Sequence, residues 1–130
     1  MRMDYRLEVV QVPVSDVDRA KAFYSDQVGF KLDRDHQVSD DVRVIQLTPP
    51  GSGCSIVIGT GLADMEPGSV KGLQLVVADL DAAHAELAER GVVVSEIQVL
   101  GRPGYPGFGF VFFSDPDGNG WAVQGSEPRE

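Results

Sequence analysis

The chain has 130 residues, 42% hydrophobic and 24% charged, a composition typical of a soluble globular protein with a real core. Its formal net charge of −9, without any cluster of Lys and Arg, argues against nucleic acid and anionic membrane surfaces as partners. It lacks a signal-peptide pattern and any apolar run of the roughly 18–20 residues that span a membrane. Its single cysteine excludes an intramolecular disulfide. We therefore expect a cytoplasmic protein.

The first half of the chain predicts one helix among four strands. Leu7–Val14 is β-branched and ends at a polar turn, which is typical of a strand. Ser15 or Asp16 then caps an amphipathic helix over Ser15–Gln27, and Gly29 ends it. The further strands are predicted over Phe30–Arg34, Val42–Thr48 and Cys54–Gly59.

The second half repeats this order after Thr60–Val70, a segment without periodicity that we interpret as a linker. The pattern predicts the strand Gly72–Val77, the helix Asp79–Arg90, the strand Val92–Leu100, the loop Gly101–Gly107 and a hairpin of Phe108–Ser114 with Trp121–Gly125. Proline and Asp-Gly and Asn-Gly steps build the hairpin turn Asp115–Gly120. The polar tail Ser126–Glu130 is expected to fray.

An internal repeat links the two halves. Val14–Ala22 aligns with Val77–Ala85 without a gap, including the capping Asp and the small residues that face the sheet. Further along, Thr48–Ser55 aligns with Asp115–Ala122. Two anchors in the same order indicate a duplicated β-α-β-β-β unit.

The stretches VPVSDVDRAKAFYSDQVGF and FFSDPDGNGW resemble the glyoxalase/bleomycin-resistance/dioxygenase superfamily, also called the vicinal oxygen chelate superfamily, and the resemblance runs from Leu7 to Gly125. It implies an α+β fold of two tandem βαβββ modules that form a curled, open-barrel-like mixed sheet with the helices outside. The expected organisation is a single glyoxalase-like domain over 1–130, with module 1 at about 6–59, a linker at 60–70 and module 2 at about 71–126. The resemblance also implies a homodimer and a small-molecule site in the cavity, formed within one chain or across the dimer.

In the enzymes of this superfamily the cavity holds a divalent metal, and each module supplies two ligands. Transferred position by position, the ligand sites fall on Val9, Ser55, Gly72 and Ala122. A divalent ion needs several N or O donors, and Val, Gly and Ala offer no side-chain donor. Glu8 is adjacent, but a shift of one residue turns a side chain to the opposite face of the strand. We therefore predict no metal cofactor.

Three glutamines lie two residues beyond three of these positions, and therefore on the same strand faces: Gln11, Gln74 and Gln124. In one interpretation they donate hydrogen bonds to a neutral polar ligand. In another they satisfy each other or bound water, as buried polar groups must. In a third they ligate a metal weakly.

Aromatic residues late in the chain are the candidates for an apolar ligand wall: Tyr105, Phe108, Phe110, Phe112 and Trp121. Alternation puts the three phenylalanines on one face of their strand, which meets either the cavity or the helices. Tyr105 lies in the Gly/Pro-rich loop, where it could cover a cavity mouth.

The other reactive side chains offer no recognisable catalytic arrangement. His36 and His84 are interpreted as surface residues, and Arg43 and Arg102 either as anion contacts or as exposed charges. Cys54 sits in an apolar strand and is interpreted as a small buried hydrophobe.

The resulting prediction is a glyoxalase/bleomycin-resistance-like protein that holds a small aromatic or amphipathic ligand without the family's metal site. The predicted ligand-binding residues are Gln11, Gln74, Gln124, Tyr105 and Trp121, and no catalytic residue is predicted. The alternatives are a metal-dependent lyase or dioxygenase with displaced ligands, for which Glu8, His36 or the glutamines would supply donors, a metal-free isomerase, and an interaction module without a ligand.

Overall fold

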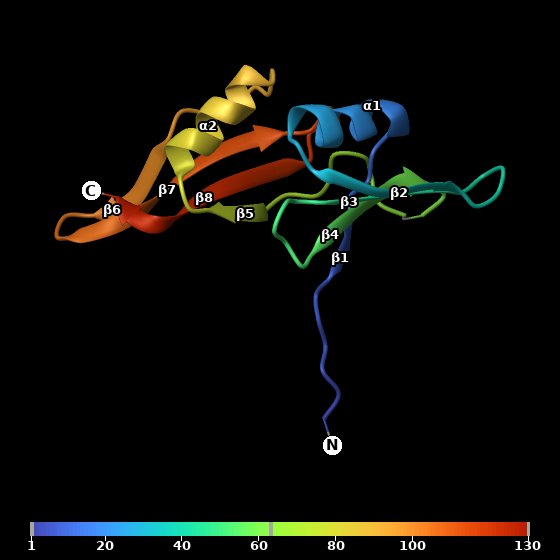
Figure 1. Cartoon of the computed structure of the whole chain (residues 1–130), viewed down its shortest axis with the longest axis horizontal. Helices are drawn as coiled ribbons and strands as arrows, with labels where there is room; N and C mark the ends of the chain where they lie inside the picture. Colours follow the sequence, from blue (N-terminus) through green and yellow to red (C-terminus); the bar gives the residue numbers. More distant parts are fainter. Residues whose placement is uncertain (1, 63, 130) are drawn as a thin grey trace. The chain divides into compact units, whose positions relative to one another are not determined.

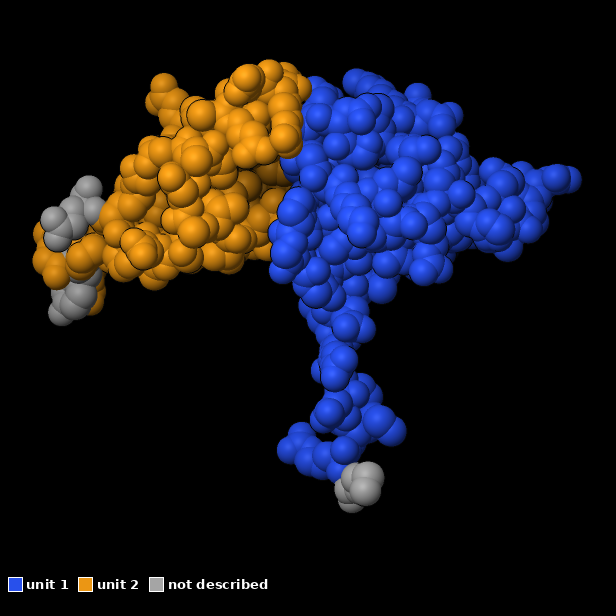
Figure 2. Space-filling model, viewed as in Figure 1, with its two compact units in different colours: residues 1–67 blue, residues 68–130 orange. Residues whose placement is uncertain are grey.

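The computed structural model describes residues 2–62 and 64–129, apart from the side chain of Tyr105. Within these residues the chain forms two compact units, residues 1–67 and 68–130 (Figure 2). Each unit repeats the order strand, helix, three strands, and each has its own open four-stranded sheet (Figure 1). The predicted α+β fold of two tandem βαβββ modules is confirmed.

Unit 1 has the strand order β1-β4-β3-β2, with β1 parallel to β4 and the other pairs antiparallel. Its elements are β1 (Val9–Gln11), α1 (Val17–Ala22), the π-helical turn η1 (Phe23–Gln27), β2 (Lys31–Gln37), β3 (Arg43–Thr48) and β4 (Ser55–Thr60). The predicted first strand is wrong in its extent, since only three of its residues pair with β4.

Unit 2 has the equivalent order β5-β8-β7-β6, with β5 parallel to β8. Its elements are β5 (Leu73–Val77), α2 (Leu80–Glu89), β6 (Gln98–Arg102), β7 (Tyr105–Ser114) and β8 (Gly120–Arg129). No helix among the described residues is long and apolar enough to cross a membrane.

The same cap starts both helices, at equivalent positions of the repeat. The Asp16 carboxylate accepts the backbone N–H of Arg19 at 3.1 Å, and that of Asp79 accepts the backbone N–H of Ala82 at 3.0 Å. Each cap satisfies one of the N–H groups that a helix start leaves without an internal partner. Asp16, rather than Ser15, is therefore the first cap.

In each unit the helix covers one face of the sheet, and the core lies between them. In unit 1, Ile45, Leu47 and Ile58 are fully buried beneath α1 and η1. The Tyr24 ring of η1 stacks on Phe30, with 5.7 Å between the ring centroids. In unit 2, Leu80 of α2 lies over the sheet so closely that two strand positions beneath it are glycines, Gly109 and Gly125.

The end of the chain corrects two expectations. The tail is not frayed, because β8 continues to Arg129, whose guanidinium pairs with the Asp81 carboxylate of α2 at 3.0 Å. The loop predicted over 101–107 is a tight turn, since β6 runs to Arg102 and β7 begins at Tyr105. The predicted strand over 92–100 is also wrong in its extent, because ladder pairing begins only at Gln98.

An ion cluster ties α1 to the β2–β3 hairpin of unit 1. Arg43 of β3 donates to Asp35 of β2 at 2.8 and 2.9 Å and to Asp18 of α1 at 2.9 Å, and Lys21 donates to Asp35 at 2.8 Å. These hydrogen bonds, from Arg43 first and Lys21 second, hold the pKa of Asp35 well below its ordinary value. The same contacts raise the pKa of Arg43.

This cluster predicts an acid-sensitive contribution to stability. The pKa of Asp35 is lower in the folded chain than in the unfolded chain, so its stabilising effect is complete above about pH 4 and is lost as the pH falls toward the folded value. Asp35→Asn should therefore lower stability at pH 7 and flatten its decline between about pH 4 and pH 2. Urea unfolding at several pH values measures this, with the exposed Asp40→Asn as control. An unchanged acid limb in Asp35→Asn would contradict it.

Candidate functional site

The candidate site is the face of the unit 2 sheet that lies opposite α2. Val111, Phe113 and Val123 point toward the helix side and are buried. Side chains alternate along a strand, so the residues between them face the other way. This open face, as we call it, presents Gln74, Val76, Gln98, Phe110, Phe112, Ala122 and Gln124.

Strand register places these side chains in rows across the sheet. Val76 is opposite Gln124, Gln124 is opposite Phe110, and Phe110 is opposite Gln98. The adjoining row joins Gln74, Ala122 and Phe112. The rings of Phe110 and Phe112 lie nearly parallel, at an interplanar angle of 8° with 6.3 Å between centroids. The phenylalanine stripe therefore belongs to the open face and not to the helix side.

A hydrogen-bonded glutamine pair borders the aromatic stripe. Gln74 Nε2 donates to Gln124 Oε1 at 2.5 Å, across the parallel strands β5 and β8. Each amide uses one group in this bond, so Gln74 retains a carbonyl acceptor and Gln124 retains an NH₂ donor. An acceptor and a donor thus stand side by side next to two phenylalanine rings.

A hollow of about 620 Å³ opens at Phe112 and Ala122 of the open face, and its lining residues include neither glutamine of the pair. Phe112, Ala122 and Gly72 line it, together with the segment Val93–Ser95 that follows α2. The Ser95 backbone N–H donates to the Phe112 carbonyl at 2.9 Å, and the Ser95 hydroxyl accepts from the Phe112 N–H at 2.9 Å. This segment therefore forms a fixed wall, and the lining is largely apolar.

The predicted ligand-binding residues fall in different places. Gln74 and Gln124 lie together on the open face. Trp121 borders the hollow, yet it is 4% exposed and its ring stacks on Phe113 at 6.0 Å. Gln11 belongs to unit 1, where it borders a separate hollow of about 220 Å³. The side chain of Tyr105 lies outside the described residues, so its assignment stays a prediction.

The sequence interpretation missed Val76, Gln98 and Leu100 as members of this surface. Leu100 is opposite Phe108, and both side chains are exposed although apolar. The alternation of side chains along a strand could have grouped Val76 with Gln74, and Leu100 with Gln98, because each pair is two residues apart. The pairing of Gln98 with Phe110 could not be inferred, because it depends on where β6 begins.

The side chains at the four positions to which the resemblance transfers the metal ligands do not fit a divalent metal. Val9 and Ser55 are opposite each other in the β1–β4 register, and the Ser55 hydroxyl is hydrogen-bonded to that of Thr48 at 2.6 Å. In unit 2, Ala122 is opposite Gln74 rather than Gly72. One neutral hydroxyl among them falls short of the donors that such an ion requires. The described residues contain no cluster of three or more His, Cys, Asp or Glu that could hold one.

The corresponding face of unit 1 carries different chemistry. Thr48 lies between Ser55 and Asp33, and its hydroxyl donates to the Asp33 carboxylate. In the neighbouring row Arg34 is opposite Gln46, and Gln46 is opposite Val57. This face therefore mixes hydroxyl, amide and charged groups with valines such as Val57, and none of the residues that it presents in the described strands is Phe, Tyr or Trp.

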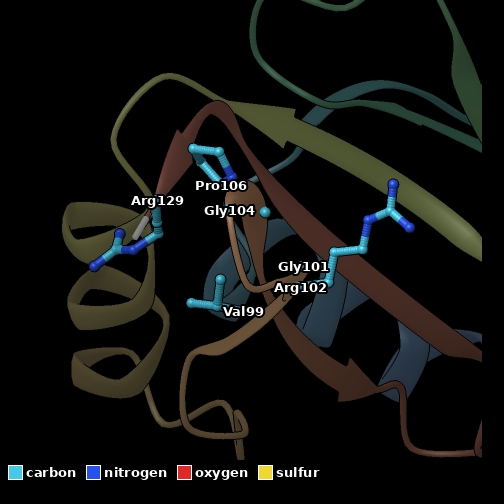
Figure 3. A pocket seen from close by; sticks show the side chains of 7 residues that line it. Val99, Gly101, Arg102, Gly104, Pro106 and Arg129 are labelled. Carbon is cyan, nitrogen blue, oxygen red and sulfur yellow. The ribbon is translucent and has the colours of Figure 1, made fainter.

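A third hollow, of about 440 Å³, lies at the β6–β7 turn of unit 2 and is lined by Arg102 and Arg129 among others (Figure 3). Two arginines could suggest an anion site. However, Arg129 extends to Asp81 on α2, and the two guanidinium groups point in different directions (Figure 3). They do not converge on one anion.

The remaining candidate side chains occupy structural or surface positions. Arg43 is engaged by two carboxylates, which favours its interpretation as a structural charge over that of an anion contact. His36 is exposed on β2, and His84 is half-buried on α2. Cys54 lies just before β4 and is half-buried rather than buried within the strand as predicted, with its thiol 3.8 Å from the Ser55 carbonyl oxygen.

Known proteins are similar to this chain in both sequence and fold. The model of the Glyoxalase/Bleomycin resistance protein/Dioxygenase superfamily matches residues 6–123. TnmS3, an antibiotic binding protein from Streptomyces sp. CB03234, is 36% identical with a TM-score of 0.79, over 99% of this chain and 100% of that one. A glyoxalase/bleomycin resistance protein from the same organism is 39% identical with a TM-score of 0.73, over 91% and 98%. A superfamily member from Sphaerobacter thermophilus DSM 20745 is 29% identical with a TM-score of 0.80, over 96% and 100%.

Proposed function

This chain belongs to the Glyoxalase/Bleomycin resistance protein/Dioxygenase superfamily, and on that basis we propose that it binds a small aromatic or amphipathic molecule without a metal ion. The observation that carries the proposal is the open face of unit 2, where Phe110 and Phe112 lie beside the Gln74–Gln124 pair. Aromatic side chains next to a few fixed polar groups are typical of small-molecule sites. The likeness to TnmS3, an antibiotic binding protein, supports the same class of function.

Each part of the open face has a separate role in this proposal. The phenylalanine rings offer flat apolar area on which a planar ligand stacks, releasing water from both surfaces. The Gln74 carbonyl and the Gln124 NH₂ group orient the ligand by accepting and donating one hydrogen bond each. The hollow beside Val93–Ser95 takes the part of the ligand that extends beyond the rings.

Phe112 provides the direct test of this surface. Phe112→Ala should weaken binding of a planar aromatic ligand by about 10- to 100-fold, because it removes one of two stacking rings. A thermal-shift panel of planar aromatic compounds identifies a ligand, and calorimetric titration then gives its dissociation constant. Leu32→Ala is the matched control, since Leu32 lies in unit 1 and has the same 39% exposure. Equal losses in both variants, or none in Phe112→Ala, would place the ligand elsewhere.

The alternative of a lyase or dioxygenase with displaced ligands predicts a bound metal. Metal analysis of protein purified without chelator separates the two functions. We expect substoichiometric zinc, nickel and iron, and aromatic binding that EDTA leaves unchanged. Stoichiometric metal whose removal abolishes binding would establish the alternative.

A further inference from the structure

Ala122 lies on β8, an inner strand of the unit 2 sheet, and the hollow opens over its small side chain. It is opposite Gln74 of β5 on one side and opposite Phe112 of β7 on the other. Gln124 follows two residues along β8 and therefore faces the same way. Neighbouring strands lie about 4.8 Å apart, so a planar ring placed over Ala122 contacts the Phe112 ring on one side and reaches both glutamines on the other.

The glutamine pair offers a ligand one acceptor and one donor, whichever way the two amides are turned. The bond from Gln74 Nε2 to Gln124 Oε1 uses the NH₂ group of one amide and the carbonyl of the other. Turning both amides reverses this bond and again leaves one carbonyl and one NH₂ group. Each remaining group is attached to the same carbon as the bonded group, so the two stay close together. A ligand that satisfies both must carry its own donor and acceptor on neighbouring atoms.

A lactam edge has this arrangement. The ring holds the amide of a lactam in the cis form, so its N–H and C=O lie side by side on one edge. An open-chain secondary amide is trans, which puts the N–H and the C=O on opposite sides. A flat ring system with a lactam edge therefore fits the glutamine pair along its edge and Phe112 along its face.

The charges around the site favour a neutral ligand. Among the described residues, neither the open face nor the lining of the hollow presents a charged side chain. Lys71 lies near Gly120, but its ammonium group donates to the Gly118 carbonyl. A carboxylate ligand would need two donors and an amidinium ligand two acceptors, whereas the pair offers one of each. A charged ligand would therefore lose its hydration without gaining matched partners.

We propose that the open face of unit 2 prefers neutral, planar heterocycles with a lactam edge. The Gln74 carbonyl accepts the lactam N–H, the Gln124 NH₂ group donates to the lactam C=O, and Phe112 stacks on the ring. This inference rests on the proposed function and adds to it the chemical class of the ligand.

Two isomers test the class directly. In 2-quinolone the N–H and the C=O are on neighbouring ring atoms, whereas in 4-quinolone the same groups are on opposite sides of the ring. In calorimetric titrations 2-quinolone should bind about 10-fold tighter than 4-quinolone, because only 2-quinolone satisfies both amides at once. N-methyl-2-quinolone, which lacks the donor, should lose a similar factor. Equal affinity for 2-quinolone and 4-quinolone would overturn the proposal.

Variants of the pair test the assignment of the partners. Gln74→Met removes the acceptor at similar side-chain length, so it should abolish the preference for 2-quinolone over 4-quinolone. Gln46→Met, in unit 1, is the matched control and should retain that preference. Gln124→Glu replaces the donor with a carboxylate, so it should favour 2-aminoquinolinium, whose two N–H donors are adjacent, over 2-quinolone. A preference for 2-quinolone that persists in Gln74→Met would overturn the proposal.

The same titrations with Phe112→Ala separate the ligand class from the proposed function. If 2-quinolone and 4-quinolone bind equally and Phe112→Ala weakens both by about 10-fold or more, the lactam class is wrong and the aromatic site stands. If neither compound binds, or if Phe112→Ala leaves both affinities unchanged, the proposed function fails and the lactam class fails with it.

Discussion

Replacing Asn119 with alanine is expected to lower the free energy of unfolding by about 2–4 kcal/mol. Asn119 is fully buried in the β7–β8 turn, where its Nδ2 donates to Asp115 Oδ2 at 2.8 Å and its Oδ1 accepts the Val70 N–H at 3.1 Å. Alanine deletes both bonds and leaves a carboxylate oxygen and a backbone N–H with one partner fewer. Buried polar groups that lose their partners each cost on the order of 1–3 kcal/mol.

Chemical denaturation of Asn119→Ala against the unmodified chain measures this loss. Asn119→Asp is an informative companion, because it keeps the shape but replaces the Nδ2 donor with a carboxylate facing Asp115. Two adjacent carboxylates raise at least one pKa, so this variant should recover stability relative to the unmodified chain as the pH falls from 7 to 5. A loss below about 1 kcal/mol in Asn119→Ala would show that water replaces both bonds.

Gly59→Ala is expected to cost a similar amount, about 2–4 kcal/mol, for a steric reason. Gly59 lies in β4 opposite Val44, and a Cβ at this position would stand 1.9 Å from the Arg43 carbonyl oxygen and 2.7 Å from Leu62 Cδ1. The nearest atom is backbone of the neighbouring strand, so the clash is relieved only by separating β3 from β4. The Arg43 ion cluster stands at the same end of β3 and should weaken with it.

Gly53→Ala is the matched control for this variant. It lies just before β4, and a Cβ there would meet no atom within 4 Å. We expect its unfolding free energy to stay within about 0.5 kcal/mol of the unmodified chain. If the two alanine variants unfold at the same denaturant concentration, the close approach at Gly59 is not a constraint in solution.

Local chemistry made the repeated fold predictable from sequence. Asp16 and Asp79 occupy equivalent positions in the two repeats. Each carboxylate accepts a hydrogen bond from a backbone N–H of the first helical turn. The Pro-Asp-Gly-Asn-Gly turn likewise acts within a few residues, with the Asp115 carboxylate accepting the N–H groups of Asp117 and Asn119 at 3.0 and 2.9 Å. Features of this kind need no knowledge of the tertiary structure.

The misassigned segments depend on partners distant in sequence. The polar tail becomes part of β8 because Pro128 and Arg129 pair with Phe108 and Gly107. The last residue of the predicted linker, Val70, is likewise held by distant residues: its carbonyl accepts the Gly120 N–H at 2.9 Å and its N–H donates to Asn119. Neither the tail nor the end of the predicted linker has apolar periodicity. The sequence of each segment therefore gives no indication that distant residues pair with it.

The site was predictable in its chemistry but not in its geometry. Period-two alternation correctly put the phenylalanines on one face, while the choice between that face and the helix side required the sheet. The repeat alignment also suggested equivalent registers in both halves. In fact Val9 is opposite Ser55, whereas Ala122 is opposite Gln74, two positions further along than the alignment implies. A register shift of two residues leaves every side chain on the same face of the sheet. Gln74 and Gln124 therefore still lie on one face and are hydrogen-bonded.

The two units therefore have the same strand order but present different side chains on their open faces. Unit 1 offers the Ser55–Thr48–Asp33 hydroxyl chain where unit 2 offers two phenylalanines and an amide pair. A molecule that fits the open face of unit 2 would find no equivalent site on the open face of unit 1. The repeat has therefore duplicated the backbone of the module but not the side chains of its open face, so the proposed function predicts one ligand-binding face per chain rather than two.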